Sequence, residues 1–251
     1  MVATGAVLGG DNGEMKLGLL VCDHVRPEYL EISGDYEAMF RRLFASHDDV
    51  DVVAYDSIEG ELPFDPSECD AWLVTGSRFS VNDDAQWIRD LEEFVRQVAR
   101  TDVPFIGICF GHQLIAKALG GSVVKSDRGW GVGVKEVEVR KDLGLGDSYR
   151  LLTSHQDQVT TVPPGGEILG WNEHCPVSVM GVGANMLGIQ GHPEFDPAYS
   201  EALMEARRGK SIPESVVEAG MASLDQPSDS ARLADWIIDF VEKRRGWEPS
   251  T

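Results

Sequence analysis

The stretch Val103-Pro-Phe-Ile-Gly-Ile-Cys-Phe-Gly-His-Gln113 is an apolar run that leads into a G-x-C-x-G motif centred on Cys109. Leu114, Ala118 and Leu119 follow with helical spacing, so we expect a strand, a tight turn at the cysteine and then a helix. Glycines two residues before and after a nucleophile relieve crowding at such a turn and leave its side chain exposed. The helix start also favours the reactive thiolate. We therefore interpret Cys109 as a nucleophile.

Three further apolar runs indicate that this stretch belongs to an α/β domain. Their nearly unbroken hydrophobicity is typical of strands covered on both faces. The runs are Lys16–Cys22, Val50–Tyr55 and Ala71–Thr75. Helical periodicity over residues 36–44 and 87–98 fills two of the gaps, and Asn82, Asp83 and Asp84 are candidate N-caps for the second helix. Strand and helix in alternation predict parallel strands joined by right-handed crossovers.

The rest of the chain changes character. Apolar alternation at residues 132 and 134 slips by one position at residues 137 and 139, which predicts a bulged, antiparallel strand. Runs at 177–181 and 186–190 continue the sheet, and helices follow. We expect a flexible N-terminal extension over residues 1–14 and a single domain over 15–251, with a helical extension from about residue 198.

The composition excludes several classes of partner. The 251 residues include 22 Lys and Arg against 42 Asp and Glu, a formal net charge of −20, which repels nucleic acids and anionic lipid surfaces. No apolar stretch approaches the roughly 18 residues that a membrane-spanning helix needs, and residues 1–14 lack the pattern of a signal peptide. We expect a cytoplasmic protein that binds neither nucleic acid nor membrane.

The cysteines other than Cys109 do not suggest a second chemistry. Cys22, Cys69 and Cys175 have no G-x-C-x-G context, and no pair of cysteines forms a C-x-x-C motif. A zinc site, a dithiol redox site and a disulfide framework are therefore not indicated. We expect these three thiols to be structural.

A thiol nucleophile needs a base, and the base needs an orienting group. Of the six histidines, His192 is the one whose neighbours orient it, within Gly191-His-Pro-Glu194 after an apolar run. Pro193 favours an extended conformation at His192, and residues two apart in an extended segment point to the same side. Glu194 is thus expected to hold one ring nitrogen while the other faces the thiol.

Together, Gly107-Ile-Cys-Phe-Gly-His-Gln113 and Gly191-His-Pro-Glu194 resemble the signature of class I glutamine amidotransferases. The resemblance implies a flavodoxin-like three-layer sandwich with a mostly parallel central sheet and antiparallel additions. It also implies that Cys109 attacks the side-chain amide of glutamine and forms a γ-glutamyl thioester, with His192 shuttling the proton and Glu194 orienting His192. Glutamate and ammonia are the products, and neither a cofactor nor a metal is required.

The same resemblance assigns further residues. Oxyanion donors are expected to be the backbone N–H groups of Phe110 and Gly76. Gln113 is expected to help hold the glutamyl group. The segment SHQDQV at residues 154–159 is similar to S-H-x-D-x-V in the amidotransferase half of GMP synthase, which places Gln156 and Asp157 near the amino-acid end of the substrate. For Asp157 a solvated loop is an equal alternative. His112 and His155 are expected to be structural.

Departures from the common family pattern leave three functions open. Thr75-Gly-Ser77 stands where many relatives have Gly-Gly-Pro, and the loop after it looks more like stand-alone members related to γ-glutamyl peptidases. No G-x-x-x-x-G-K-[ST] phosphate loop occurs, so an ammonia-accepting synthase would be a separate chain. The chain is then an amidotransferase that supplies such a synthase, a self-sufficient γ-glutamyl peptidase, or a non-catalytic binding protein on the same fold.

Overall fold

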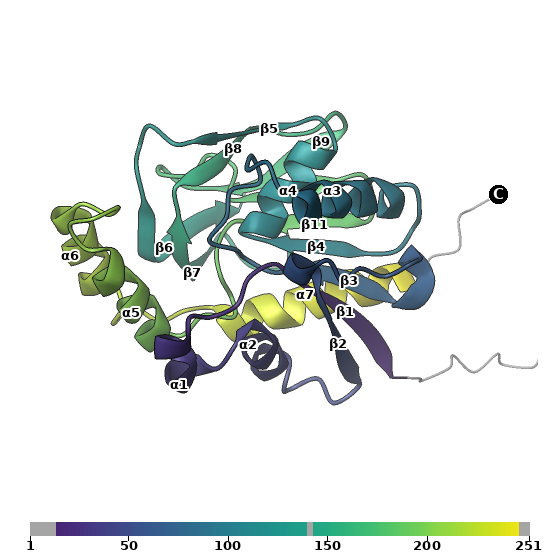
Figure 1. Cartoon of the computed structure of the whole chain (residues 1–251), viewed down its shortest axis with the longest axis horizontal. Helices are drawn as coiled ribbons and strands as arrows, with labels where there is room; N and C mark the ends of the chain where they lie inside the picture. The colour runs from purple at the N-terminus through teal and green to yellow at the C-terminus, as the bar shows by residue number, and fades with distance from the viewer. Residues whose placement is uncertain (1–13, 140–142, 246–251) are drawn as a thin grey trace, which may run out of the picture.

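A nine-stranded sheet with the order β2-β1-β3-β4-β11-β10-β9-β6-β7 forms the centre of the computed structural model, which describes residues 14–139 and 143–245 (Figure 1). The strands are β1 (Met15–Val21), β2 (Val50–Asp56), β3 (Ala71–Val74), β4 (Phe105–Ile108), β5 (Ser122–Lys125), β6 (Gly131–Val139), β7 (Ser148–His155), β8 (Asp157–Thr161), β9 (Gly166–Trp171), β10 (Val179–Val182) and β11 (Met186–Ile189). Strands β2, β1, β3, β4 and β11 are parallel, and β10, β9, β6 and β7 continue the sheet antiparallel. Strands β5 and β8 form a separate pair.

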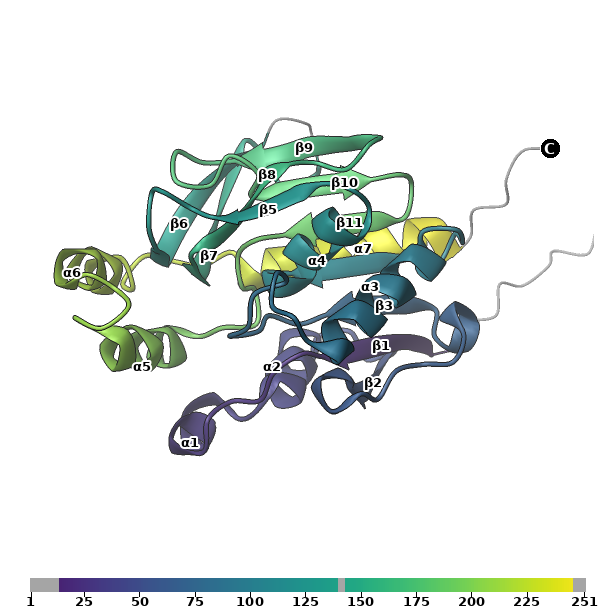
Figure 2. The ribbon, with the colours of Figure 1, turned by 45° about the horizontal axis from the view of Figure 1, so that its top comes forward.

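Helices cover both faces of the sheet. They are α1 (Leu30–Ser33), α2 (Tyr36–Leu43), α3 (Gln86–Val98), α4 (Phe110–Ala118), α5 (Pro197–Arg207), α6 (Glu214–Ala222) and α7 (Ser230–Arg245), with short 3-10 turns at Pro27–Tyr29, Ser57–Glu59 and Pro66–Glu68. Apolar side chains of α2 and α7 pack with one face, and those of α3 and α4 with the other, whereas α5 and α6 lie beyond β6 and β7 (Figure 2). The expected three-layer α/β fold, with a parallel centre and antiparallel additions, is confirmed.

Three local predictions were wrong. Strand β2 is not covered on both faces, because it lies at the edge of the sheet and only Val52 in it is buried. Helix α3 has Ala85 at its N-cap, since the carboxylate of Asp83 accepts from Ser80 within the preceding loop and Asp84 pairs with Arg89.

Strand β6 is antiparallel as expected but pairs with β7 without a bulge. Residues 131–134 of β6 are all buried because α5 and α6 cover this end, so burial there does not alternate.

The expected N-terminal extension over residues 1–14 falls outside the described residues, except for Glu14.

The junction between β4 and α4 is the tight turn that the glycines predict. Cys109 has a φ of 51°, and it is the one non-glycine residue with a positive φ among the described residues. A Cβ at Gly107 would lie 2.3 Å from the carbonyl oxygen of Gly111, and a Cβ at Gly111 would lie 2.7 Å from the carbonyl oxygen of Val74. Any side chain at either position would push the helix away from the strand, so both glycines are required by close packing.

We predict that Gly107→Ala lowers the free energy of unfolding by about 3 kcal/mol, because backbone atoms of α4 cannot move aside for the new methyl group. Gly165→Ala is the matched control: Gly165 has a φ of 75°, but no atom lies within 4 Å of the position that its Cβ would take. Its cost should therefore be limited to the backbone penalty of about 1 kcal/mol. Equal losses in urea unfolding for the two variants would contradict the packing argument.

Candidate active site

Four parallel strands end at the same edge of the sheet, and the residues that follow them form the candidate site. These are residues 22–26 after β1, 75–80 after β3, 109 after β4 and 190–195 after β11. Hydrogen bonds fix their positions: Cys22 N–H donates to Thr75 Oγ1 (3.0 Å), and Cys109 N–H donates to the carbonyl of Ile189 (2.8 Å). The site therefore lies where open α/β sheets bind their ligands.

His192 pairs with the Glu194 carboxylate and lies close to the Cys109 side chain. Its Nδ1 is 2.7 Å from Glu194 Oε1, so the predicted contact is present, although Pro193 and Glu194 lie in a turn and not in an extended segment. Its backbone N–H donates to the carbonyl of Leu152 (2.8 Å), which ties this segment to β7. The structure thus brings together the three residues that the sequence proposed as nucleophile, base and orienting group.

The surroundings of His192 favour its charged form. Burial alone disfavours the charge, but the Glu194 carboxylate and the Cys109 side chain outweigh it and raise the pKa of His192 to about 10. Phe195 stacks on the ring, with centroids 3.9 Å apart and planes 7° from parallel. Since Glu194 is buried and its Oε2 has no partner among the described residues, the His192 ring is the main compensation for this carboxylate.

Gln190 also contacts the thiol, although the sequence did not single it out. Its Nε2 donates to Cys109 Sγ (3.4 Å), and its Oε1 accepts from Gln113 Nε2 (3.1 Å). Gln190 comes directly after β11 and two residues before His192, so both side chains reach the same end of the sheet. That spacing was the signal available in the sequence, but an amide alone does not indicate a chemical role.

Gly76 and Phe110 lie where the oxyanion donors were expected. Phe110 begins α4 directly after Cys109, and a Cβ at Gly76 would lie 2.7 Å from His192 Cε1 and 3.7 Å from Cys109 Cβ. No hydrogen bond to another described residue occupies either backbone N–H. Both groups are therefore near the thiol and available to an oxygen bound there.

The expected substrate-binding residues are close to Cys109, but two are already engaged. Gln113 donates to the backbone carbonyl of Asp157 (2.8 Å) as well as to Gln190, so its amide also ties α4 to β8. The Asp157 carboxylate accepts from Ser80 Oγ (2.5 Å). With Gln156, these residues line a cavity of about 210 Å³ that contains Cys109. We refer to it as the thiol cavity.

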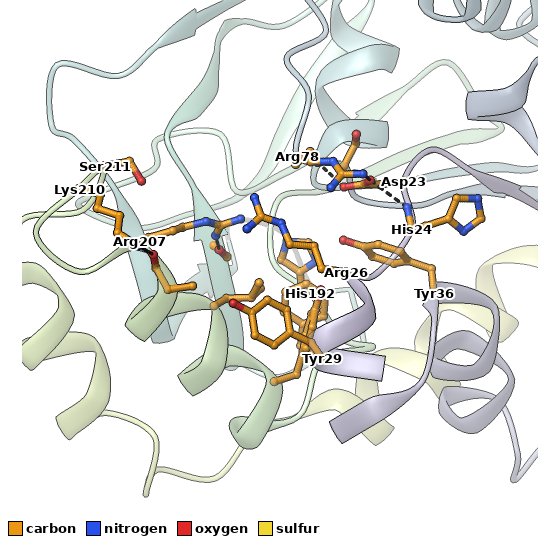
Figure 3. Close-up of a pocket in the computed structure, with 16 residues that line it drawn as sticks. Asp23, His24, Arg26, Tyr29, Tyr36, Arg78, His192, Arg207, Lys210 and Ser211 are labelled. Carbon is orange, nitrogen blue, oxygen red and sulfur yellow. Dashed lines mark hydrogen bonds and ion pairs between the residues drawn. The ribbon is translucent and has the colours of Figure 1, made fainter. Parts of the chain in front are cut away.

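A second cavity has a volume of about 310 Å³, and the residues that line it are drawn in Figure 3. His192 and Phe195 line it, whereas Cys109 does not, and we refer to it as the imidazole cavity. The two cavities adjoin, because four residues line both: Ser77, Arg78, Ser154 and Arg207. His192 and Cys109 thus each line one of two adjoining cavities, and each cavity is large enough for part of a small-molecule ligand.

The remaining cysteines and two histidines have surroundings that suit structural roles. Burial raises the thiol pKa of Cys22, Cys69 and Cys175, in the case of Cys175 to about 11. These thiols therefore stay protonated near pH 7. Burial lowers the pKa of His112 to about 4 and that of His155 to about 3, so both rings are neutral near pH 7. His155 lines the thiol cavity, and its Nδ1 lies 3.2 Å from the backbone carbonyl oxygen of Asp157.

The described residues form neither a cluster of metal-binding side chains nor a membrane-spanning helix. Within 14–139 and 143–245, no group of three or more His, Cys, Asp or Glu side chains is arranged to hold a metal ion. Over the same ranges, no helix combines the length and apolar character needed to cross a bilayer.

Comparison with known proteins agrees with this geometry. The family model described as glutamine amidotransferase class-I matches residues 34–208. The chain is 26% identical over 200 residues to γ-glutamyl peptidase 4 of Arabidopsis thaliana, covering 75% of this chain and 80% of the relative. It is 38% identical over 102 residues to one subunit of the glutamine-hydrolyzing GMP synthase of Methanosphaera stadtmanae, covering 39% of this chain and 54% of the relative.

A solved structure of a glutamine amidotransferase from Thermotoga maritima has the same fold. It superposes with a TM-score of 0.72 at 18% identity and covers 93% of this chain and 99% of its own. The family match spans both sequence motifs and the ends of three of the four strands that build the site. The chain belongs to the class I glutamine amidotransferase family.

Proposed function

We propose that the protein hydrolyses the γ-glutamyl amide bond of glutamine or of a larger γ-glutamyl compound through a thioester on Cys109. The observation that carries the proposal is the position of His192, held by Glu194 at 2.7 Å and lying against the thiol. A nucleophile, a base and an orienting group in contact are what such a reaction requires. The intact constellation argues against a non-catalytic binding protein.

In the first half of the proposed reaction, the Cys109 thiolate attacks the γ-carbonyl carbon and the carbonyl oxygen becomes an oxyanion. The N–H groups of Phe110 and Gly76 stabilise this oxyanion. The imidazolium of His192 then gives its proton to the amide nitrogen, the carbon–nitrogen bond breaks, and the amine leaves. Cys109 retains the γ-glutamyl group as a thioester.

In the second half, neutral His192 accepts a proton from water, and the resulting hydroxide attacks the thioester carbon. The carbon–sulfur bond breaks and the thiolate is regenerated beside the imidazolium. The glutamyl group leaves as glutamate. Glu194 orients the ring through both halves, and Gln113, Gln156 and Asp157 are proposed to hold the glutamyl part in the thiol cavity.

Two forms of this function differ in what becomes of the amine. Similarity to γ-glutamyl peptidase 4 extends over more of the chain than similarity to the GMP synthase relative, which supports a self-sufficient hydrolase. The second relative supports the other form, in which a separate synthase takes up ammonia released from glutamine. A purified chain that turns over without a partner favours the first form.

Glutamate release from glutamine and from γ-glutamyl dipeptides tests the proposal. We predict that Cys109→Ala lowers kcat/KM at least about 1,000-fold, because it removes the nucleophile. Cys69→Ala is the matched control, since that thiol is also buried but packs far from the site, against Trp72. Hydrolysis at the wild-type rate by the Cys109 variant would overturn the proposed reaction.

The pH dependence tests the role of Glu194. A raised pKa means that His192 keeps its proton up to alkaline pH, so activity that needs the imidazolium is lost only as the pH rises through that value. Glu194→Gln removes the charge that favours the imidazolium. The alkaline decline of kcat/KM should therefore move to lower pH, by about one unit or more. An unchanged or upward-shifted alkaline limb would exclude this role.

The reactivity of Cys109 tests the role of Gln190. We predict that Gln190→Met slows alkylation of Cys109 by iodoacetamide about ten-fold at pH 7, because a thiolate loses a hydrogen-bond donor. Cys109→Ser gives the background from the other cysteines. If Gln190 only fills space, the isosteric methionine will leave the alkylation rate unchanged.

A further inference from the structure

The arrangement of the two cavities fixes the direction in which a substrate must lie. This argument rests on the proposed hydrolysis of γ-glutamyl amides. The acyl carbon has to reach Cys109 Sγ, which lines the thiol cavity, and the leaving nitrogen has to reach His192, which lines the imidazole cavity. The glutamyl part therefore occupies the thiol cavity, and the leaving group projects into the imidazole cavity.

The imidazole cavity is large for ammonia. Its volume is about 310 Å³, whereas a molecule the size of water, or of ammonia, takes about 30 Å³ in a liquid. Tyr29, Tyr36 and Tyr199 also line it and supply flat apolar surfaces as well as hydroxyl groups. Its size therefore suits a leaving group comparable to an amino acid or a short peptide.

The cavity is also positively charged, in a chain whose formal net charge is −20. Arg26, Arg78, Arg207 and Lys210 line it, against the single carboxylate of Asp23. That carboxylate is already paired with Arg78, at 2.8 Å. The other three cations have no acidic partner among the described residues. An excess of positive charge is thus concentrated beside the catalytic histidine.

Arg207 is the best placed of these cations. It is the last residue of α5, half-buried, and lines both cavities. Its Nη1 donates to Ser154 Oγ (2.8 Å), and its guanidinium lies 5.3 Å from the ring centroid of Trp130. These contacts fix the side chain without neutralising it. Figure 3 shows the Arg207 and Arg26 side chains reaching toward one another across the cavity, with His192 beneath them.

Two arginines that face one another without a carboxylate between them repel, and burial makes the uncompensated charge of Arg207 more costly. A bound anion would relieve both effects. A carboxylate suits the site because the planar guanidinium binds its two oxygens together.

We propose that the imidazole cavity binds a leaving group that carries a carboxylate, and that Arg207 recognises it. The preferred substrates are then γ-glutamyl amino acids or peptides with a free C-terminal carboxylate rather than glutamine itself. Arg26 and Lys210 add positive charge at the rim. Recognition of the leaving group in this way requires no second protein.

A neutral analogue isolates the proposed contact. γ-Glutamylglycine and γ-glutamylglycinamide have the same glutamyl part and the same scissile bond, and they differ only in the terminal carboxylate. We expect the wild-type chain to have a kcat/KM at least about ten-fold higher for γ-glutamylglycine, since charge-assisted hydrogen bonds are among the stronger ones. Arg207→Gln should abolish this preference by lowering only the value for γ-glutamylglycine.

Two variants control the comparison. Arg208→Gln removes the neighbouring arginine, which pairs with Glu205 and lines neither cavity, and should keep the preference. Arg207→Lys keeps the positive charge and should retain part of the preference for γ-glutamylglycine. Activity toward the glycinamide in each variant reports that the site is still folded.

The outcomes separate this inference from the proposed hydrolysis. Equal wild-type rates for the two dipeptides, or an equal loss for both in Arg207→Gln, would overturn the carboxylate site while leaving the hydrolase intact. An equal loss for both dipeptides would mean that Arg207 binds the glutamyl part of the substrate instead. If no compound is hydrolysed, the hydrolase proposal fails. Calorimetric binding of both dipeptides to Cys109→Ala then still decides the carboxylate site, which requires tighter binding of γ-glutamylglycine.

Discussion

The backbone of Cys109 is the constraint on which the site depends. A φ of 51° at a residue with a side chain costs free energy, so neighbouring contacts must hold it in place. Gly107 and Gly111 let α4 pack directly on β4 and β3, and the Cys109 N–H is anchored to Ile189 of β11. Cys109 consequently lies at the end of the parallel sheet, where it is buried but lines the thiol cavity, next to the N–H of Phe110.

The charges of the site follow from that position. His192, two residues after Gln190, reaches Cys109 because β11 pairs directly with β4. Glu194 is buried next to the His192 ring and favours the charged form of that ring. Two adjoining cavities meet here, and we propose that one holds the acyl group and that the other holds an acidic leaving group, because three of its cations have no acidic partner among the described residues.

Residues whose roles depend on local spacing could be predicted from the sequence. The glycines around Cys109, the H-P-E segment and the order of strands and helices belong to this group. Features set by distant packing could not: β2 lies at the edge because of the strand order, and α3 begins without a side-chain cap because Asp83 and Asp84 bond elsewhere. Arg207 was likewise missed, since a helix-terminal arginine gains meaning only when α5 brings it to His192. The division into a flexible extension and one domain stays a prediction.

Acid quenching of the protein during turnover of γ-glutamylglycine, followed by mass spectrometry of its peptides, tests the central claim most directly. We expect one γ-glutamyl group attached to the peptide that contains Cys109, labile to hydroxylamine as a thioester is, and none on the peptides that contain Cys22, Cys69 or Cys175. The protein should be quenched while substrate is in excess and under conditions where acylation outpaces deacylation. Continued hydrolysis with no acyl group on Cys109 would then contradict the thioester mechanism.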